Sequence, residues 1–241
     1  MRPDPTEILQ PSIFIGNLEI GEPVTMITDL MIAACAFYAW RKLKARAHEG
    51  KVFTFFRWFF LLTAIGTAMG GILGHGFLYA LNPNWKLLGF YVGMFAVVAI
   101  ERSAIIHALP LINPKIGKAF LVINALELVV MMIFTAIYLH FKFVEYHVGY
   151  GFLIVVFGFH LYVYLKTKDA GSKIILWNTV FLLVTVFIFN YPIIIHEWFN
   201  HRDFAHIFMA ITQIVLLRAA FKLGYKKDGT PIPETGATQR L

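Results

Sequence analysis

Residues 53–80 read FTFFRWFFLLTAIGTAMGGILGHGFLYA, and this stretch decides the class of fold. It is almost wholly apolar, and as a single α-helix it exceeds the roughly 20 residues that cross the hydrocarbon core of a bilayer. Near its end, His75 stands between two glycines, so the helix surface beside the imidazole is cleared of bulk. The stretch predicts a membrane-spanning helix that carries one polar group close to a membrane surface.

The composition of the whole chain agrees with a membrane protein. Hydrophobic residues make up 59% of its 241 residues and charged residues only 15%, whereas a soluble domain has about 25% charged residues. The sequence therefore predicts an all-α fold, a polytopic seven-transmembrane helix bundle. The expected spans are residues 22–41, 53–80, 85–109, 118–141, 144–166, 173–197 and 203–222.

The distribution of Lys and Arg predicts how the bundle is oriented. One side of the expected spans collects 17 of the 21 basic residues, and cytoplasmic loops carry such an excess. The N-terminus is then outside and the C-terminus cytoplasmic. Residues 1–21 are expected to form an extracytoplasmic segment, 22–223 the transmembrane domain and 224–241 a disordered tail. We expect an integral protein of the cell membrane, such as a bacterial inner membrane.

The net charge of +7 does not indicate a nucleic-acid partner, because the basic residues are divided among loops. The single cysteine, Cys35, excludes an intramolecular disulfide. The partners expected from this composition are membrane lipids and a lipid-like small molecule. The oligomeric state stays open.

Five ionisable residues are expected at one depth, near the outer surface. Glu22 and Asp29 lie in the outer half of the first span, His75 near the outer end of the second, and Asp203 and His206 at the start of the seventh. Ionisable groups in spans usually face the bundle interior or a cavity. The spacing also places Glu22 and Asp29 on one face of the first span. Asp203 and His206 likewise share one face of the seventh span. We expect a shared polar site.

Structural roles remain open for the same residues. Glu22 precedes a proline and Asp203 begins a helix, so both are candidates for helix capping, and His75 can hydrogen-bond a neighbouring helix. A second polar feature lies deeper, where Glu127 and Asn124 share one face of the fourth span. Because an unpaired carboxylate in hydrocarbon is costly, Glu127 is predicted to face the interior and to bond a neighbouring helix.

Three short segments resemble a known superfamily of seven-helix membrane hydrolases. They are EPVTMITDL at 22–30, GILGH at 71–75 and RDFAH at 202–206. With seven spans and an outside N-terminus, they are similar to the alkaline ceramidases and adiponectin-type receptors. The chain departs from that pattern in three places: Gly71 takes the serine position, Arg202 the first histidine position of the last motif, and Lys86 lies near the expected aspartate.

The resemblance implies a zinc-dependent hydrolase that acts on a lipid amide or ester at the outer leaflet. It implies His75, Asp203 and His206 as zinc ligands, with His75 and Asp203 catalytic. Such a set of two imidazoles and one carboxylate leaves a position for an activated water. Glu22 and Asp29 would orient these ligands or bind calcium through their oxygens.

Other function classes fit the same scaffold. A lipid receptor or sensor would bind without turnover. A transporter or proton pathway would use Glu101, Asn124 and Glu127 together with the outer cluster. Paired histidines can also hold haem. A retinal protein is disfavoured, because the seventh span has no lysine between Arg202 and Lys222.

Overall fold

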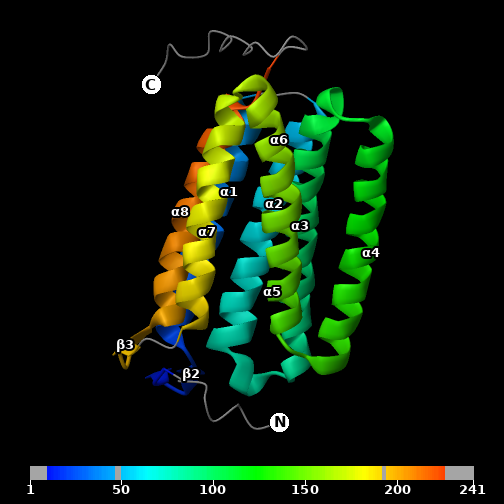
Figure 1. The fold of residues 1–241 in the computed structure, drawn as a ribbon. Coiled ribbons are helices and arrows are strands. Elements are labelled where there is room, and N and C mark those ends of the chain that lie inside the picture. Colours follow the sequence, from blue (N-terminus) through cyan, green and yellow to red (C-terminus); the bar gives the residue numbers. More distant parts are fainter. Residues whose placement is uncertain (1–9, 47–49, 192–193, 226–241) are drawn as a thin grey trace.

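The computed structural model describes residues 10–46, 50–191 and 194–225. Seven helices within these residues are long and apolar enough to span a membrane, as predicted. The spans are Pro23–Ala45, Lys51–Gly76, Pro83–Leu111, Pro114–Tyr138, Lys142–Thr167, Ala170–Asn190 and His201–Lys222. Figure 1 shows them as a bundle of roughly parallel rods. This is the architecture of an integral membrane protein.

Several spans are built from more than one regular element. Two contain π-helical turns, which widen the helix locally and often occur at functional sites. The main elements are α1 (Pro23–Ala45), α2 (Lys51–Met69) with π-helix η1 (Gly70–Gly76), α3 (Lys86–Ala108), α4 (Pro114–Tyr138), α5 (Lys142–Gly149) with π-helix η5 (Tyr150–Val156), α6 (Phe157–Thr167), α7 (Ala170–Asn190) and α8 (His201–Lys222). Short 3₁₀ turns flank α3: η2 (Leu78–Ala80), η3 (Pro83–Trp85) and η4 (Leu109–Leu111).

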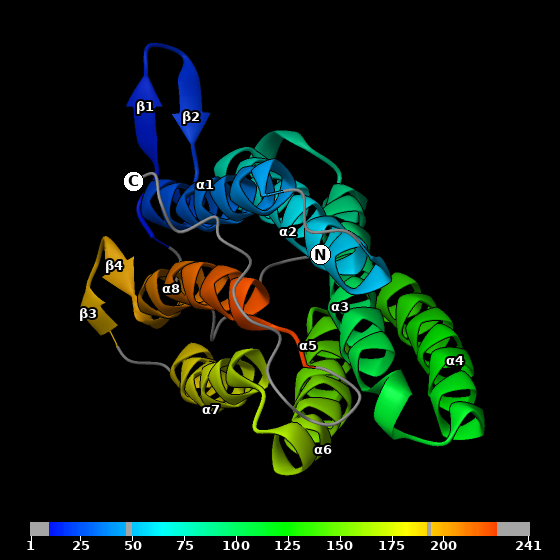
Figure 2. The ribbon, with the colours of Figure 1, turned by 90° about the horizontal axis from the view of Figure 1, so that it is seen from above.

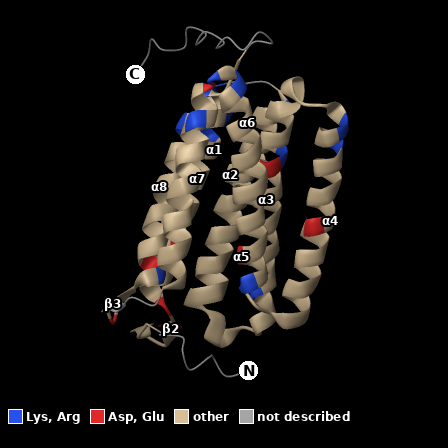
Figure 3. Cartoon of the chain, viewed as in Figure 1, with Lys and Arg blue, Asp and Glu red and all other residues tan. Residues whose placement is uncertain are grey.

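Two antiparallel hairpins mark one end of the bundle, which we call the hairpin end (Figure 1). They are β1 (Ile13–Ile15) with β2 (Leu18–Ile20), and β3 (Ile194–His196) with β4 (Phe199–Asn200). Lys and Arg gather mainly at the opposite end, which we call the basic end (Figure 3). The first helix starts at the hairpin end and the last helix ends at the basic end.

The sixth span is shorter than predicted. It was expected to reach residue 197, but α7 ends at Asn190. Tyr191 precedes Pro192 by one residue and has an extended backbone, with φ −101° and ψ 113°. A residue before proline is excluded from the helical region by contact with the proline ring, so the helix stops there.

Glycines bring two helix pairs into close contact. A Cβ added at Gly66 of α2 would lie 3.1 Å from the backbone nitrogen of Gly93 of α3, and one at Gly89 would lie 3.3 Å from that of Gly70. Each helix thus carries two glycines four residues apart, a spacing that lets membrane helices approach closely. At the other contact, a Cβ on Gly171 of α7 would lie 2.6 Å from the nitrogen of Leu223.

Viewed along the bundle, α2 lies between α1 and α3, while α8 packs against α1 and α7 (Figure 2). The large apolar core occupies the half of the bundle near the basic end. Its fully buried members include Leu43, Phe56, Phe60, Ile100 and Leu216. The other half, near the hairpin end, contains the polar residues that were predicted to form a site.

Candidate functional site

The acidic residues of α1 lie where the helix begins. Glu22 is in the N-cap position, but its side chain makes no capping hydrogen bond. It contacts Nδ1 of His75 through Oε2 instead. Burial raises the pKa of Glu22, but the hydrogen bond with His75 and the positive charges of His75, Arg202 and Lys86 outweigh burial, so the pKa lies below its ordinary value. Glu22 is therefore an ionised partner that orients the imidazole.

The π-helical segment η1 holds His75 against the start of α1. The backbone nitrogen of Gly21 donates to Gly76 O at 2.8 Å, and that of Glu22 donates to His75 O at 3.3 Å. A Cβ on Gly71 would lie 2.9 Å from Cβ of Asp29, so only glycine fits there. Gly71, four residues before His75, thus allows η1 and α1 to approach closely.

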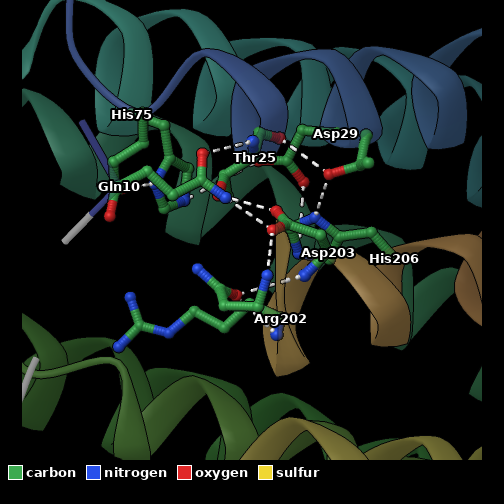
Figure 4. Close-up of polar contacts among 10 residues, drawn as sticks. Gln10, Thr25, Asp29, His75, Arg202, Asp203 and His206 are labelled. Atoms are coloured by element: carbon green, nitrogen blue, oxygen red, sulfur yellow. Dashed lines mark hydrogen bonds and ion pairs between the residues drawn. The ribbon is translucent and has the colours of Figure 1, made fainter. Parts of the chain in front are cut away.

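Asp29 lies between the two predicted histidines (Figure 4). Its Oδ2 is 3.8 Å from Nε2 of His75, and its Oδ1 is 3.6 Å from Nε2 of His206. The three side chains come from α1, η1 and α8. The prediction that these helices bring their polar groups to one place therefore agrees with the geometry.

The hydrogen-bond network assigns the protons on His206. The Thr28 hydroxyl donates to Thr25 O at 3.0 Å, so its oxygen accepts from Nδ1 of His206, also at 3.0 Å. When His206 is neutral, its Nε2 is then the nitrogen without a proton. By the same reasoning, His75 donates from Nδ1 to Glu22 and presents an unprotonated Nε2. Two basic nitrogens thus face the two oxygens of one carboxylate.

Asp203 has a different environment from the one predicted for it. It is fully buried. Its Oδ1 accepts from the Thr25 hydroxyl at 2.7 Å, and its Oδ2 accepts from Gln10 Nε2 at 2.5 Å and from the Asn200 backbone at 2.8 Å. With Asn200 it forms a capping box at the start of α8. This is the structural role left open for Asp203, and its oxygens are directed at these donors.

The zinc set expected from the resemblance does not form in the described structure. Within residues 10–46, 50–191 and 194–225, no group of three or more His, Cys, Asp or Glu side chains is placed to hold a metal ion. The hydrogen bonds to both oxygens of Asp203 give the physical reason for that residue. The structure places Asp29 rather than Asp203 beside both His75 and His206, and zinc ligation by the expected set stays a prediction from the resemblance.

Thr25 lies on the same predicted stripe of the first span as Glu22 and Asp29, but three other members of this site were not predicted. Gln10 and Asn200 join it from the segments that precede α1 and α8, where no helical periodicity indicates a partner. Thr28 could have been found, because it follows Thr25 by three residues on a helix and therefore lies close to the same face. We call the complete group the hairpin-end cluster: Gln10, Glu22, Thr25, Thr28, Asp29, His75, Asn200, Asp203 and His206.

An apolar groove lies between α1 and the helix formed by α2 and η1, and its lining begins about one turn from the cluster. Its volume is about 580 Å³. Ala33, one turn beyond Asp29, and Ile72, three residues before His75, lie at its end nearest the cluster. The full lining is Ala33, Phe37, Leu61, Ala64, Ile65, Ala68, Met69, Ile72 and Leu73. From Leu61 to Leu73 the groove follows α2 for about 18 Å at 1.5 Å per residue.

The deeper polar feature also forms as predicted. Glu127 of α4 contacts Nδ1 of His147 of α5 at 2.6 Å, which confirms that it bonds a neighbouring helix. His147 lies near the start of the expected fifth span, where a histidine usually meets water, but it is fully buried, and its Nε2 donates to Met94 O at 3.0 Å. The contact with α3 accounts for the difference.

At the basic end, the described structure continues beyond the predicted boundary at residue 223. The backbone of Gly224 donates to Asp169 Oδ1 at 3.1 Å, and the Tyr225 hydroxyl donates to His107 O. These bonds dock the end of α8 against α3 and the α6–α7 turn. The rest of the predicted tail, residues 226–241, lies outside the described residues.

Comparison with known proteins gives a family but no activity. Neither the curated proteins nor the solved structures contain a match. The family of unknown function DUF6962 matches residues 24–225, which include all seven spans and most of the hairpin-end cluster. The chain therefore belongs to this family of unknown function, DUF6962.

Proposed function

We propose that the protein is a membrane-embedded hydrolase that cleaves an amide or ester bond of a lipid-like molecule, with His75 as general base. The hairpin end would face the outside, because 17 of the 21 Lys and Arg residues lie toward the other side. The observation that carries the proposal is the arrangement of His75, Asp29 and His206 at the end of an apolar groove.

The groove supports a substrate with an apolar chain. It is lined only by apolar side chains and opens between two spans, where the surroundings in a membrane are hydrocarbon. An acyl chain along the groove would place the polar part of a lipid near Asp29 and His75. Burying each methylene of such a chain contributes about 0.8 kcal/mol relative to water, which favours an amphiphile over a soluble substrate.

The chemistry follows from the orientation of His75. Glu22 accepts from Nδ1, so Nε2 is free to take a proton from a water molecule as that water attacks the carbonyl carbon. Asp29, 3.8 Å away, would stabilise the imidazolium that results. The imidazolium then returns its proton to the leaving nitrogen or oxygen, which releases a fatty acid and an amine or alcohol. His206 provides a second acceptor for a hydroxyl or ammonium of the substrate.

A second candidate is a receptor that binds the same lipid without turnover. Gly71 favours it, because in the superfamily that the three short segments resemble a serine occupies that position and would contribute a hydrogen bond. Binding requires only the groove and the polar cluster. Release of product is the property that separates the two candidates.

The test uses the full chain purified in detergent micelles with a panel of acyl-labelled ceramide-type amides and glycerolipid esters. We expect release of the labelled fatty acid from at least one, and a loss of about 10²–10⁴-fold in His75→Gln, the range for removal of a general base. His196→Gln is the matched control, because His196 is exposed in β3 and outside the cluster. Binding of a labelled lipid without product from any substrate would overturn the hydrolase and leave the receptor.

Elemental analysis of the same sample tests the metal-dependent form implied by the resemblance. Zinc in a 1:1 ratio that is lost in His75→Gln and His206→Gln would replace the metal-free mechanism. A further variant, Ala68→Phe, fills the groove and should raise KM for long acyl chains more than for short ones. An equal effect on both would contradict the assignment of the groove to the acyl chain.

A further inference from the structure

A separate polar cluster lies in the interior of the bundle, about 10 Å from the basic end of α3 and about 15 Å from that of α4 at 1.5 Å per residue. We call it the midspan cluster: Glu101, Asn124, Glu127, His147 and Tyr150. The proposed hydrolase does not use it. Glu101, Asn124 and His147 are fully buried.

The pair of His147 and Glu127 is electrically neutral in either of its protonation patterns. Met94 O can only accept a hydrogen bond, so Nε2 of His147 carries a proton. One more proton lies between Nδ1 and Glu127 Oε2, which are 2.6 Å apart. Whether that proton resides on the nitrogen or on the oxygen, the net charge of the pair is zero, and both imidazole nitrogens are occupied.

Glu101 has no comparable compensation. Its Oε2 accepts from Asn124 Nδ2 at 2.7 Å, which is a neutral donor. Its Oε1 is buried and has no hydrogen-bond partner among the described residues. A Cβ on Gly151 would lie only 2.8 Å from this Oε1, so the oxygen is directed at the π-helix η5. An ionised carboxylate would place an uncompensated negative charge in the interior of a membrane bundle, at a large cost.

The other ionisable groups in the cluster do not compensate the charge of an ionised Glu101. The pair of His147 and Glu127 is neutral, and Tyr150 is uncharged at neutral pH. Arg102 is the neighbouring residue on α3, and its half-buried side chain forms no hydrogen bond or ion pair with Glu101 among the described residues, although its charge acts on Glu101 at longer range. The ionisable side chains on neighbouring elements that interact with Glu101 are Glu127 on α4, His147 on α5 and Tyr150 on η5.

We propose that Glu101 is a proton-binding site in the interior of the bundle, carrying one exchangeable proton in this fold. Two further observations support a functional site rather than a buried structural acid. Asn124 Oδ1 and the Tyr150 hydroxyl are also buried without partners in the described structure, so both groups are available for a further hydrogen bond. In addition, the helix that faces Glu101 is π-helical at that point, a feature that often marks functional sites.

The proton is released when the Glu101 O–H bond breaks and a water molecule accepts the proton, which leaves the carboxylate in place. The ionised carboxylate then needs a new donor or charge, and the unpartnered Tyr150 hydroxyl on η5 is a donor within the same cluster. Protonation of Glu101 is thereby linked to the packing of η5 on α3. Intramembrane acids of this kind form proton relays in pumps and transporters.

Infrared spectroscopy on the full chain in lipid nanodiscs tests this proposal, because a protonated carboxylic acid has its own carbonyl band. At about pH 7 we expect that band in the wild type, sensitive to exchange in D₂O. Its intensity should fall by that of one carboxylic acid in Glu101→Gln and stay unchanged in Glu145→Gln, whose carboxylate is paired with Lys142 at 2.6 Å. A wild type without the band, or a band of undiminished intensity in Glu101→Gln, overturns the proposal.

The stability of the same variants gives an independent readout. Glutamine has the shape and charge of a protonated glutamic acid, so Glu101→Gln should fold and melt close to the wild type. A variant that fails to fold would show that the fold needs the carboxylate, and this also overturns the proposal. Salt dependence separates a proton from a sodium ion. If NaCl but not choline chloride raises the thermal stability of the wild type, and neither salt raises that of Glu101→Gln, the site binds a sodium ion instead.

Discussion

Replacing Asp203 with alanine tests whether this residue is a structural centre of the hairpin-end cluster. The change removes the acceptor for three donors: the Thr25 hydroxyl, the Gln10 amide and the Asn200 backbone nitrogen. Thr25 is fully buried and Asn200 is 2% exposed, so neither donor can turn to water. A buried donor without a partner costs about 1–3 kcal/mol.

The two most buried donors together predict a loss of about 2–6 kcal/mol in the free energy of unfolding. This is a large part of the roughly 5–15 kcal/mol that stabilises a typical protein. Unfolding of the purified chain in mixed micelles with increasing SDS measures the loss. Glu19→Ala serves as the control, because Glu19 is half-buried in the β1–β2 hairpin and makes none of the hydrogen bonds of the cluster. A loss below about 1 kcal/mol would refute the structural role, and normal stability with abolished hydrolysis would restore the catalytic one.

Three further outcomes are expected. Gly171→Ala should lower the melting temperature, because its Cβ would lie 2.6 Å from the Leu223 backbone nitrogen and overpacking costs about 1–3 kcal/mol. Gly158→Ala is the control and should leave the melting temperature unchanged, because its Cβ would have no described atom within 4 Å. Equal effects of the two changes would contradict the close α7–α8 contact. Burial raises the pKa of Asp169, but its hydrogen bonds with His107 and Ser172 and the charge of His107 lower it from 3.8 to about 2. Its contribution is therefore complete above about pH 4 and lost as the pH falls through about 2, and an acid titration of melting temperature should show this part missing in Asp169→Asn. A reporter fused to the C-terminus should be active in the cytoplasm, and activity only outside would reverse the proposed orientation.

The sequence predicted the spans well because apolar length is a local property of the chain. It also predicted that Asp29, His75 and His206 lie at one depth, because the rise of a helix per residue is fixed. It did not predict which oxygen faces which nitrogen. Asp203 and His206 share one helix face, yet Asp203 bonds the cap of its own helix and His206 faces Asp29. These orientations depend on hydrogen bonds with Gln10, Thr25 and Thr28, which lie on other segments.

The burial of His147 could not be predicted from the sequence either. Its position near the start of the fifth span suggested contact with water. In the structure, its ring reaches between Glu127 of α4 and Met94 O of α3, and such a position depends on three helices at once. The partner of Glu127 could be anticipated as a polar group on a neighbouring helix, but not as this residue.

The π-helical turn at Gly70–Gly76 determines the direction in which His75 points. An α-helix advances by about 100° per residue around its axis, so a π turn accommodates one residue more than the α-helical register allows. Straightening this segment into an α-helix with all its residues kept would rotate everything beyond it by about that angle. His75 would then point away from Glu22 and Asp29 while the span still crossed the membrane. The orientation of His75 thus depends on a single residue of helical phase, on which membrane insertion does not depend.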